Sequence, residues 1–481
     1  METLQRTANR GSVSTGFEVG NSALFEADDS SYIRFTNIST YYSSARAKKF
    51  SNSIWIKQTE LGKTNTMVLS YAANGYLEFT STGELNFIMA FRSGSSGSGT
   101  QKQLKSTASF RDTSAWYHIV VAVDTAQSTA ADRVKVYVNG VQITDWATEQ
   151  YPDQNDESAN VYEQHNYIGT WGGGNHTNTG FCGYVAEFYF LSEISASPTD
   201  FGRFDSNGIW IPKLYTGTIT SPSSYLNFSN ASNLAEATSG QDWASGNVNS
   251  VAQATDTCTN NFCTFNPVTI SPSNLLTLSE GATQINRITT AKWNTPCSNT
   301  INVNKGKWYG EFQVGNSITM IGVGIVSVFE NTAHGSTTGP GQDESGINSG
   351  VSYYGADGKK FVGGVGSSYG SSYSSSDIIG IAMDLDNNKV YFAKNNTWQN
   401  SGDPTSGATG TGAIDLNPAG EYFFMTINGN STGQTHKANF GGYTTISISS
   451  SASDANGHGV FEYAPPSGYF ALCTKNLAEF G

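Results

Sequence analysis

The amino-acid sequence predicts an all-β protein with two antiparallel β-sandwich domains joined by an irregular segment. Stretches that alternate apolar and polar residues recur at intervals of roughly 8–12 residues, separated by Gly, Asn, Asp and Ser. Almost no stretch of the 481 residues has the 3.6-residue apolar period of a helix. The composition, with 52 Gly and only 14% charged residues, also favours strands and turns over helices.

The first sandwich is predicted at residues 26–216, after a polar and aperiodic arm at 1–25. We interpret the arm as a segment that docks on a partner and orders there. The apolar run at 116–124 predicts a central strand buried on both faces. In "DRVKVYVNGVQITDW" (132–146), alternating valines flank Asn139-Gly140, the strongest short signal for a two-residue hairpin turn.

Residues 217–265 lose the alternation and become rich in Ser, Thr, Asn and Ala, which predicts a linker with one short strand at "YLNFS". The second sandwich is predicted at 266–481. Its clearest strands lie within 306–315, 320–327, 350–364, 377–396 and 421–429. The order of apolar strand, Asp, polar turn and strand in "IAMDLDNNKVYFAKNN" repeats that of "VVAVDTAQSTAADRVKVYVNG" (120–140), as expected of two related sandwiches.

The charge excludes some partners. The net charge is −13 and the pI is about 4.9, so the chain repels phosphate backbones and anionic lipid. We therefore expect no nucleic-acid partner. The N-terminus has no apolar signal-peptide core and no stretch approaches the ~20 apolar residues of a membrane span, which predicts cytosolic synthesis and no membrane insertion.

The five cysteines form no zinc-binding pattern. Cys258 and Cys263 enclose four residues, and two interpretations stay open for them. They form a disulfide, or they are free thiols, as a chain made in a cytosol favours.

Two long motifs carry family resemblances. "WYHIVVAVDTAQSTAADRVKVYVNGVQ", followed by "YIGTW" and "FCGYVAEFYFL", resembles a concanavalin A-like or laminin-G-like jelly roll. "GKWYGEFQV", followed by "IGVGIVS" and "DIIGIAMDLDNNKVYFAKNN", resembles a SPRY domain. "FGRFDSNGIWIPKLYTG" (201–217) and "YAPPSGYFALCTKNLAE" (463–479) are similar to recurrent segments of phage virion proteins, above all tail-fibre-like chains.

The resemblance implies a virion protein, made in the host cytoplasm, that carries lectin-like modules. Its expected partners are other virion proteins and a host-surface glycan or receptor. A homotrimer is expected by analogy with fibres, although no heptad coiled coil is present. The favoured function is a non-enzymatic tail fibre or receptor-binding appendage. A capsid decoration, cement or capsid-fibre protein is the first alternative, and a surface glycan depolymerase is the second.

Catalytic residues are not expected. Concanavalin A-like folds include glucanases, which need two carboxylates about 5–5.5 Å or 6.5–9.5 Å apart. Glu187 has no acidic partner at strand spacing. Asp384 and Asp386 share a face of a strand but enter a turn, which indicates turn-capping carboxylates. The six histidines are dispersed and match no catalytic motif.

Two loops are candidates for sugar binding, which needs an aromatic face with planar polar groups around it. "GTWGGGNHTNTG" offers Trp171, Asn175, His176 and Asn178, unless this is a plain hairpin loop whose Trp packs on the sandwich edge. "SSYGSSYSSSD" offers Tyr369 and Tyr373, unless these tyrosines are framework residues.

Calcium is the one cofactor that the sequence suggests. Laminin-G-like domains often hold Ca²⁺ through Asp and backbone oxygens in loops. "YPDQNDES" supplies Asp153, Asn155 and Asp156 as candidate ligands. A solvated acidic loop is the competing interpretation.

Overall fold

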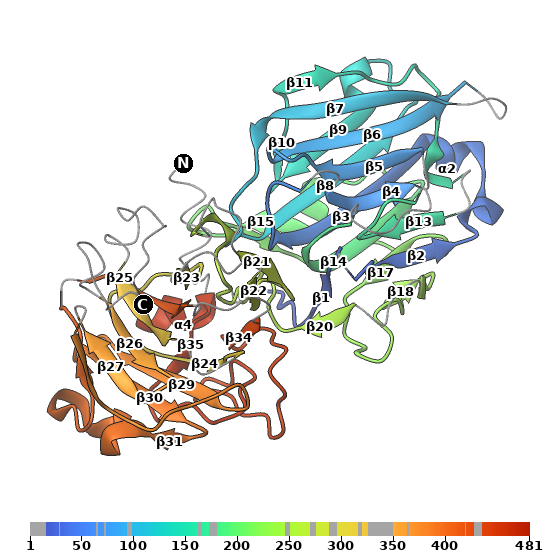
Figure 1. The fold of residues 1–481 in the computed structure, drawn as a ribbon. Helices are drawn as coiled ribbons and strands as arrows, with labels where there is room; N and C mark the ends of the chain where they lie inside the picture. Colours follow the sequence, from blue (N-terminus) through green and yellow to red (C-terminus); the bar gives the residue numbers. More distant parts are fainter. Residues whose placement is uncertain are drawn as a thin grey trace. The chain divides into compact units, whose positions relative to one another are not determined.

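The computed structural model is all-β, as predicted, with antiparallel sheets in each of two compact units (Figure 1). The first unit extends to Asn260, and the second comprises Asn261–Gly481. The structure describes residues 16–27, 29–63, 66–71, 74–93, 99–161, 165–172, 180–245, 251–269, 276–287, 296–315, 320–325, 350–362, 365–418, 420–427 and 435–481. Within these ranges, no helix has both the length and the apolar character needed to cross a membrane.

The first unit is a sandwich of two sheets around one apolar core. The first sheet has the order β10-β9-β8-β3-β14-β1-β20. Its strands are β1 (Ser22–Phe25), β3 (Lys49–Gln58), β8 (Tyr117–Asp124), β9 (Val134–Val138), β10 (Val141–Gln142), β14 (Gly183–Ser192) and β20 (Ala252–Ala254), and β17 (Ser224–Leu226) pairs with β14 and with β18 (Ser239–Gly240).

The second sheet has the order β11-β7-β6-β5-β4-β13-β2-β19. Its strands are β2 (Ile33–Thr36), β4 (Thr66–Tyr71), β5 (Gly75–Phe79), β6 (Glu84–Arg92), β7 (Thr100–Ser109), β11 (Trp146–Glu149), β13 (His165–Ile168) and β19 (Ala244–Ser245), and β12 (Glu157–Ser158) pairs with β6. The short helix α2 (Ser44–Lys48) precedes β3. The ribbon of β15 (Gly202–Phe204) and β16 (Trp210–Pro212) forms a separate two-stranded sheet.

The Asn139-Gly140 turn joins β9 and β10 as the sequence predicts. Both residues have positive φ, 49° and 80°, as a two-residue hairpin turn of this kind requires. Val134 and Val136 face the core, and the ring of Trp210 lies against Gly140 so closely that an added Cβ would clash with it. Gly140 is therefore needed both for its backbone conformation and for the packing of the β15–β16 ribbon.

The segment at 217–260 belongs to the first unit, which differs from the linker that the sequence predicts at 217–265. β17 pairs with β14, β19 with β2 and β20 with β1. These strands are two or three residues long, too short to show alternation. β1 likewise lies in the range predicted as an arm, because four residues of a strand do not stand out in a polar stretch. Residues 1–15 lie outside the described residues.

The second unit is also a two-sheet sandwich, with strand orders β21-β22-β34-β24-β29-β30-β31 and β23-β33-β25-β26-β27-β28. Its main strands are β21 (Leu276–Ser279), β22 (Gln284–Arg287), β23 (Pro296–Ser298), β24 (Lys307–Gln313), β25 (Met320–Ile325), β26 (Val351–Tyr354), β27 (Lys359–Val362), β28 (Val365–Ser368), β29 (Ile378–Asp384), β30 (Lys389–Lys394), β31 (Thr397–Trp398), β33 (Tyr422–Ile427) and β34 (Thr435–Asn439). β32 (Ile414–Asp415) pairs with β30.

The C-terminal segment is anchored to the second unit by Glu311 of β24. The carboxylate of Glu311 accepts hydrogen bonds from the backbone N–H groups of Glu462 and Tyr463, at 3.0 and 2.8 Å. Farther along the chain, β35 (Phe470–Ala471) pairs in parallel with β24, and helix α4 (Thr474–Phe480) follows. The glutamate of "GKWYGE" therefore has a structural role.

Candidate binding site at the root of the Gly169–Gly180 loop

Backbone contacts anchor both ends of the loop that is predicted to bind sugar. The N–H of Gly169 donates to Val68 O and the N–H of Phe181 donates to Gly169 O, both at 2.9 Å, and Gly180 forms a bridge with Met67. Gly169 has φ +89°, and a Cβ there would clash with the ring of Phe25. These contacts hold the two ends of the loop together at the rim where β13 ends and β14 begins.

Trp171 is half-buried and lies just beyond this root. The hydroxyl of Ser70 donates to Thr170 O at 2.8 Å. Because Leu69 and Tyr71 point into the core, Ser70 faces outward from the second sheet, and the root of the loop runs along that outer face. Asn175, His176 and Asn178 lie outside the described residues, so their part in the site stays a prediction.

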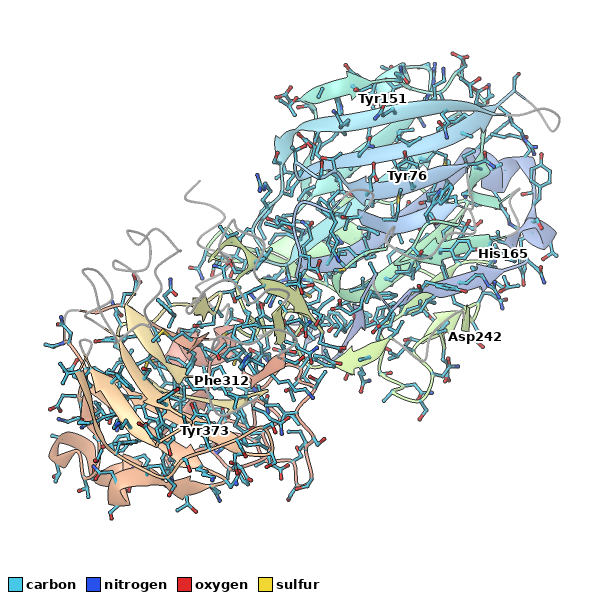
Figure 2. The ribbon with its side chains drawn as sticks, viewed as in Figure 1. Tyr76, Tyr151, His165, Asp242, Phe312 and Tyr373 are labelled. Atoms are coloured by element: carbon cyan, nitrogen blue, oxygen red, sulfur yellow. The ribbon has the colours of Figure 1, made fainter. Side chains whose placement is uncertain are left out.

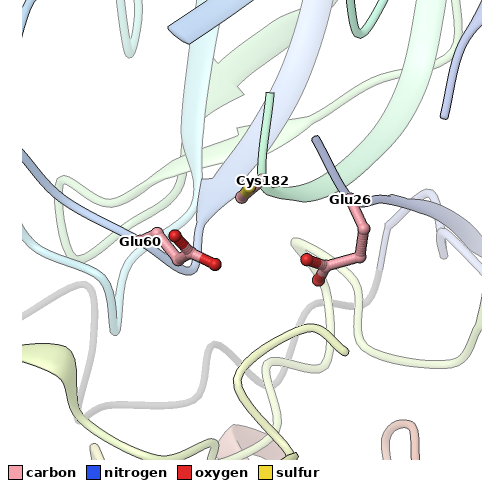
Figure 3. Close-up of side chains that lie close together, drawn as sticks. All are labelled: Glu26, Glu60 and Cys182. Atoms are coloured by element: carbon pink, nitrogen blue, oxygen red, sulfur yellow. The ribbon is translucent and has the colours of Figure 1, made fainter. Parts of the chain in front are cut away.

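A cluster of three ligand-type side chains lies at the same rim (Figure 3). Glu26 follows β1, Glu60 follows β3 and Cys182 precedes β14, and one ligand atom from each lies within 4.8 Å of the others. The N–H of Ala27 lies 3.4 Å from the sulfur of Cys182. The Nζ of Lys63 lies 2.6 Å from a carboxylate oxygen of Glu60 and 3.6 Å from the same sulfur.

Among the residues that the structure describes, these three side chains come close enough to share one cation. Lys63 already supplies a positive charge there. Burial, together with the Glu60 and Glu26 carboxylates, raises the pKa of the Cys182 thiol well above its usual range, so the thiol keeps its proton at neutral pH. The cluster ties three strand ends together. The sequence gives no signal for it, because its members are far apart along the chain.

Tyr369 and Tyr373 are core residues of the second unit, and the prediction that they contact sugar is corrected here. Their rings pack with Tyr353 and, for Tyr369, Phe392. The hydroxyl of Tyr373 donates to Tyr353 O at 2.7 Å, and that of Tyr369 accepts from Phe392 N–H at 3.2 Å. Figure 2 labels Tyr373. With exposures of 7% and 2%, they have no free ring face for a ligand.

The predicted calcium loop is a closed turn in this structure. The carboxylate of Asp156 accepts the N–H of Asp153 at 3.0 Å, and Asn155, with φ +68°, donates its N–H to Thr125 O at 2.8 Å. The side chains of Asp153 and Asn155 are exposed. This geometry fits the competing interpretation of a solvated acidic turn. Calcium binding stays a prediction.

The three carboxylates considered for catalysis each hold the fold together. Glu187 is buried and accepts the Tyr225 hydroxyl at 2.7 Å. Asp384 lies 2.8 Å from Lys307 Nζ, and Asp386 accepts the N–H of Gly306 at 2.9 Å. Asp384 also accepts the N–H of Asn387 at 3.0 Å, which fits the interpretation of turn-capping carboxylates. That the chain is not an enzyme stays a prediction.

Cys258 and Cys263, for which a disulfide and reduced thiols both stayed open, are not joined by a disulfide in this structure.

Comparisons with known proteins match the two halves of the chain separately. A model of the concanavalin A-like lectin/glucanases superfamily matches residues 27–194, and a model of the SPRY domain matches residues 307–441. No curated protein matches the chain.

Solved structures similar to this chain include SPRY domains. The TRIM65 PSpry domain is 14% identical, with 37% of this chain and 92% of that chain covered and a TM-score of 0.28. The SPRY domain of human HERC1 is 14% identical, with 36% and 96% covered and a TM-score of 0.26. Another human SPRY domain is 15% identical, with 34% and 94% covered and a TM-score of 0.24.

Both matched ranges fall within the two compact units, in the order that the sequence motifs predict. The chain therefore carries a concanavalin A-like lectin/glucanase domain followed by a SPRY domain.

Proposed function

We propose that the chain is a non-enzymatic structural protein of a phage particle that serves as a tail fibre or receptor-binding appendage and attaches to a host-surface glycan. The observation that carries the glycan-binding part is the half-buried Trp171, held at a fixed loop root on a lectin-type domain. A Trp beside polar loop residues is the combination that binds the apolar face of a pyranose.

The assignment to a virion is supported by the two segments that resemble recurrent parts of phage virion proteins. One of them, at 201–217, forms the β15–β16 ribbon that packs against the Asn139-Gly140 turn. The other, at 463–479, is the segment anchored by Glu311. Each segment packs within its own unit, which fits a structural segment that recurs after such domains.

Binding of the purified protein to host cells and to a glycan array tests the proposal. We expect Trp171→Ala to lower glycan binding about tenfold, the loss of one stacked ring. Trp398→Ala is the matched control, because Trp398 is also half-buried but lies in the second unit. A wild-type protein that binds neither host cells nor any glycan would contradict the attachment function.

Copy number in the particle distinguishes a tail fibre from the first alternative, a capsid decoration or cement protein. A fibre should occur in three or six copies at the tail, whereas a decoration protein follows the capsid symmetry. Counting copies in a particle reconstruction decides between them and also tests the proposed trimer. Release of reducing ends from host glycan, abolished in Glu187→Gln or Asp384→Asn, would favour the depolymerase alternative.

A further inference from the structure

A row of side chains crosses the outer face of the second sheet of the first unit. Tyr76 of β5 pairs with Ile88 of β6, and Ile88 pairs with Gln103 of β7. The residues that alternate with them, such as Leu77 and Leu104, point into the core. All three side chains are half-buried, so each keeps part of its surface in solvent. Tyr76 is labelled in Figure 2.

A chain of hydrogen bonds runs from this row into the neighbouring one. The Nε2 of Gln103 donates to Asn86 Oδ1 at 3.0 Å, and the Nδ2 of Asn86 donates to Glu78 Oε1 at 2.8 Å. Because Glu78 Oε1 accepts from the amide nitrogen of Asn86, it fixes which way the Asn86 amide faces, and Asn86 in turn fixes the amide of Gln103. Gln103 therefore presents its remaining amide N–H and its carbonyl oxygen in a set orientation.

Glu78 lies on the outer face of the sheet but is shielded from solvent. Its side chain is almost fully buried, with 6% of the residue exposed, and burial raises the pKa of its carboxyl group. Within the described part of the chain, its Oε2 has no hydrogen-bond partner. Because this oxygen has less than 1 Å² of exposed surface, Glu78 acts on a ligand only through the Asn86 and Gln103 amides that it orients.

The row is also continuous with the loop root. Tyr76 pairs with Ser70, whose hydroxyl holds Thr170 O. Side chains that pair across antiparallel strands lie about 5 Å apart at Cβ, so Tyr76 stands next to the segment that leads into Trp171.

We propose that Tyr76, Ile88 and Gln103 form the floor of a binding platform for an uncharged saccharide. The Tyr76 ring and Ile88 contact the apolar face of a pyranose, and the oriented Gln103 amide hydrogen-bonds a pair of adjacent hydroxyls. None of the three side chains carries a charge, so none of them forms an ion pair with an acidic sugar. This inference rests on the proposed attachment function, extends the site beyond the Trp171 loop and names its ligand class.

The test uses the full chain on an array of neutral oligosaccharides of hexoses and N-acetylhexosamines, with sialylated oligosaccharides as a second arm. Tyr76→Ala and Gln103→Leu should each lower binding to the neutral sugars about tenfold. Gln142→Leu should not lower it, because Gln142 is an exposed amide on β10 of the other sheet. Thermal unfolding of each variant shows whether the fold is kept, and Tyr76→Phe, which keeps the ring, should retain most of the binding.

The outcomes separate the platform from the proposed function. If wild type binds host cells and Trp171→Ala weakens binding while folded Tyr76→Ala and Gln103→Leu do not, the platform is wrong and the attachment function stands. Binding of the sialylated arm alone would also overturn the platform. If wild type binds neither host cells nor any oligosaccharide, both proposals fail.

Discussion

Glu187 is a carboxyl group in the interior of the first unit. It sits at a register shift in β14 and has φ +48°, a strained conformation for a residue with a side chain. Burial raises its pKa from 4.5 to about 7, and its hydrogen bond from Tyr225 offsets only part of that cost. The folded state therefore holds this proton more tightly than the unfolded chain does.

This shift predicts a pH dependence of stability. Because the folded pKa is the higher one, the contribution of Glu187 is fully present below pH 4.5 and is lost as the pH rises to about 7. The slope is about −1.4 kcal/mol per pH unit within this window. Glu187→Gln should remove this part of the slope in urea unfolding, and the exposed Glu149→Gln should not. Equal slopes in wild type and Glu187→Gln would contradict the assignment.

Lys57 and Asp256 form an ion pair that is closed off from solvent. Their charged atoms lie 2.7 Å apart, with 0% and 1% of the side chains exposed, and Trp116 Nε1 donates to the same carboxylate at 3.1 Å. Asp256→Ala leaves Lys57 without this partner and should cost about 3–5 kcal/mol of the free energy of unfolding. The double variant Lys57→Met/Asp256→Leu should recover much of that loss. If the double variant is no more stable than Asp256→Ala, the buried lysine charge is not the cause of the loss.

At the scale of elements, His118 of β8 holds the β15–β16 ribbon on the first sheet. Its ring stacks between Trp55 and Trp210, with centroids 4.8 and 6.0 Å away. Trp210 Nε1 donates to His118 Nδ1 at 3.0 Å, so the proton of the neutral ring must be on Nε2, which donates to Ser53 Oγ at 2.8 Å. Burial lowers the pKa of His118 to about 3, which keeps the ring neutral.

The packing of this ribbon predicts an unequal effect of two glycine substitutions. Gly140 and Gly208 have similar φ values, 80° and 78°, but only Gly140 faces the Trp210 ring. Gly208→Ala should cost about 1 kcal/mol from backbone strain, and Gly140→Ala should cost at least about 1 kcal/mol more. Equal losses in thermal unfolding would show that Trp210 moves aside at no cost.

The whole molecule consists of two units with separate apolar cores. We therefore expect the fragments 16–260 and 261–481 each to unfold cooperatively when produced alone, as measured by circular dichroism on heating. A fragment 16–216 should be markedly less stable than 16–260, because it lacks β17 and β20. Equal stability would support the domain boundary that composition alone suggests.

The strands with strong alternation, the Asn139-Gly140 hairpin and the order of the two sandwiches were all predictable from the sequence. That the first unit continues beyond residue 217 to residue 260 was not predictable, because β17, β19 and β20 are too short to show a period. The binding residues were predicted less well. Tyr369 and Tyr373 lie in a segment that reads as a polar loop, yet their rings fill the core of the second unit.

The sequence by itself determined the all-β class, the two sandwiches and the turns, because strand alternation and positive-φ turns depend on neighbours within a few residues. Only the tertiary structure decided which side chains meet. The Gln103–Asn86–Glu78 chain, the Glu26–Glu60–Cys182 cluster and the Trp210–His118 stack each join segments separated along the chain. Such meetings depend on cross-strand register and on how strand ends close at a rim, which no local pattern encodes.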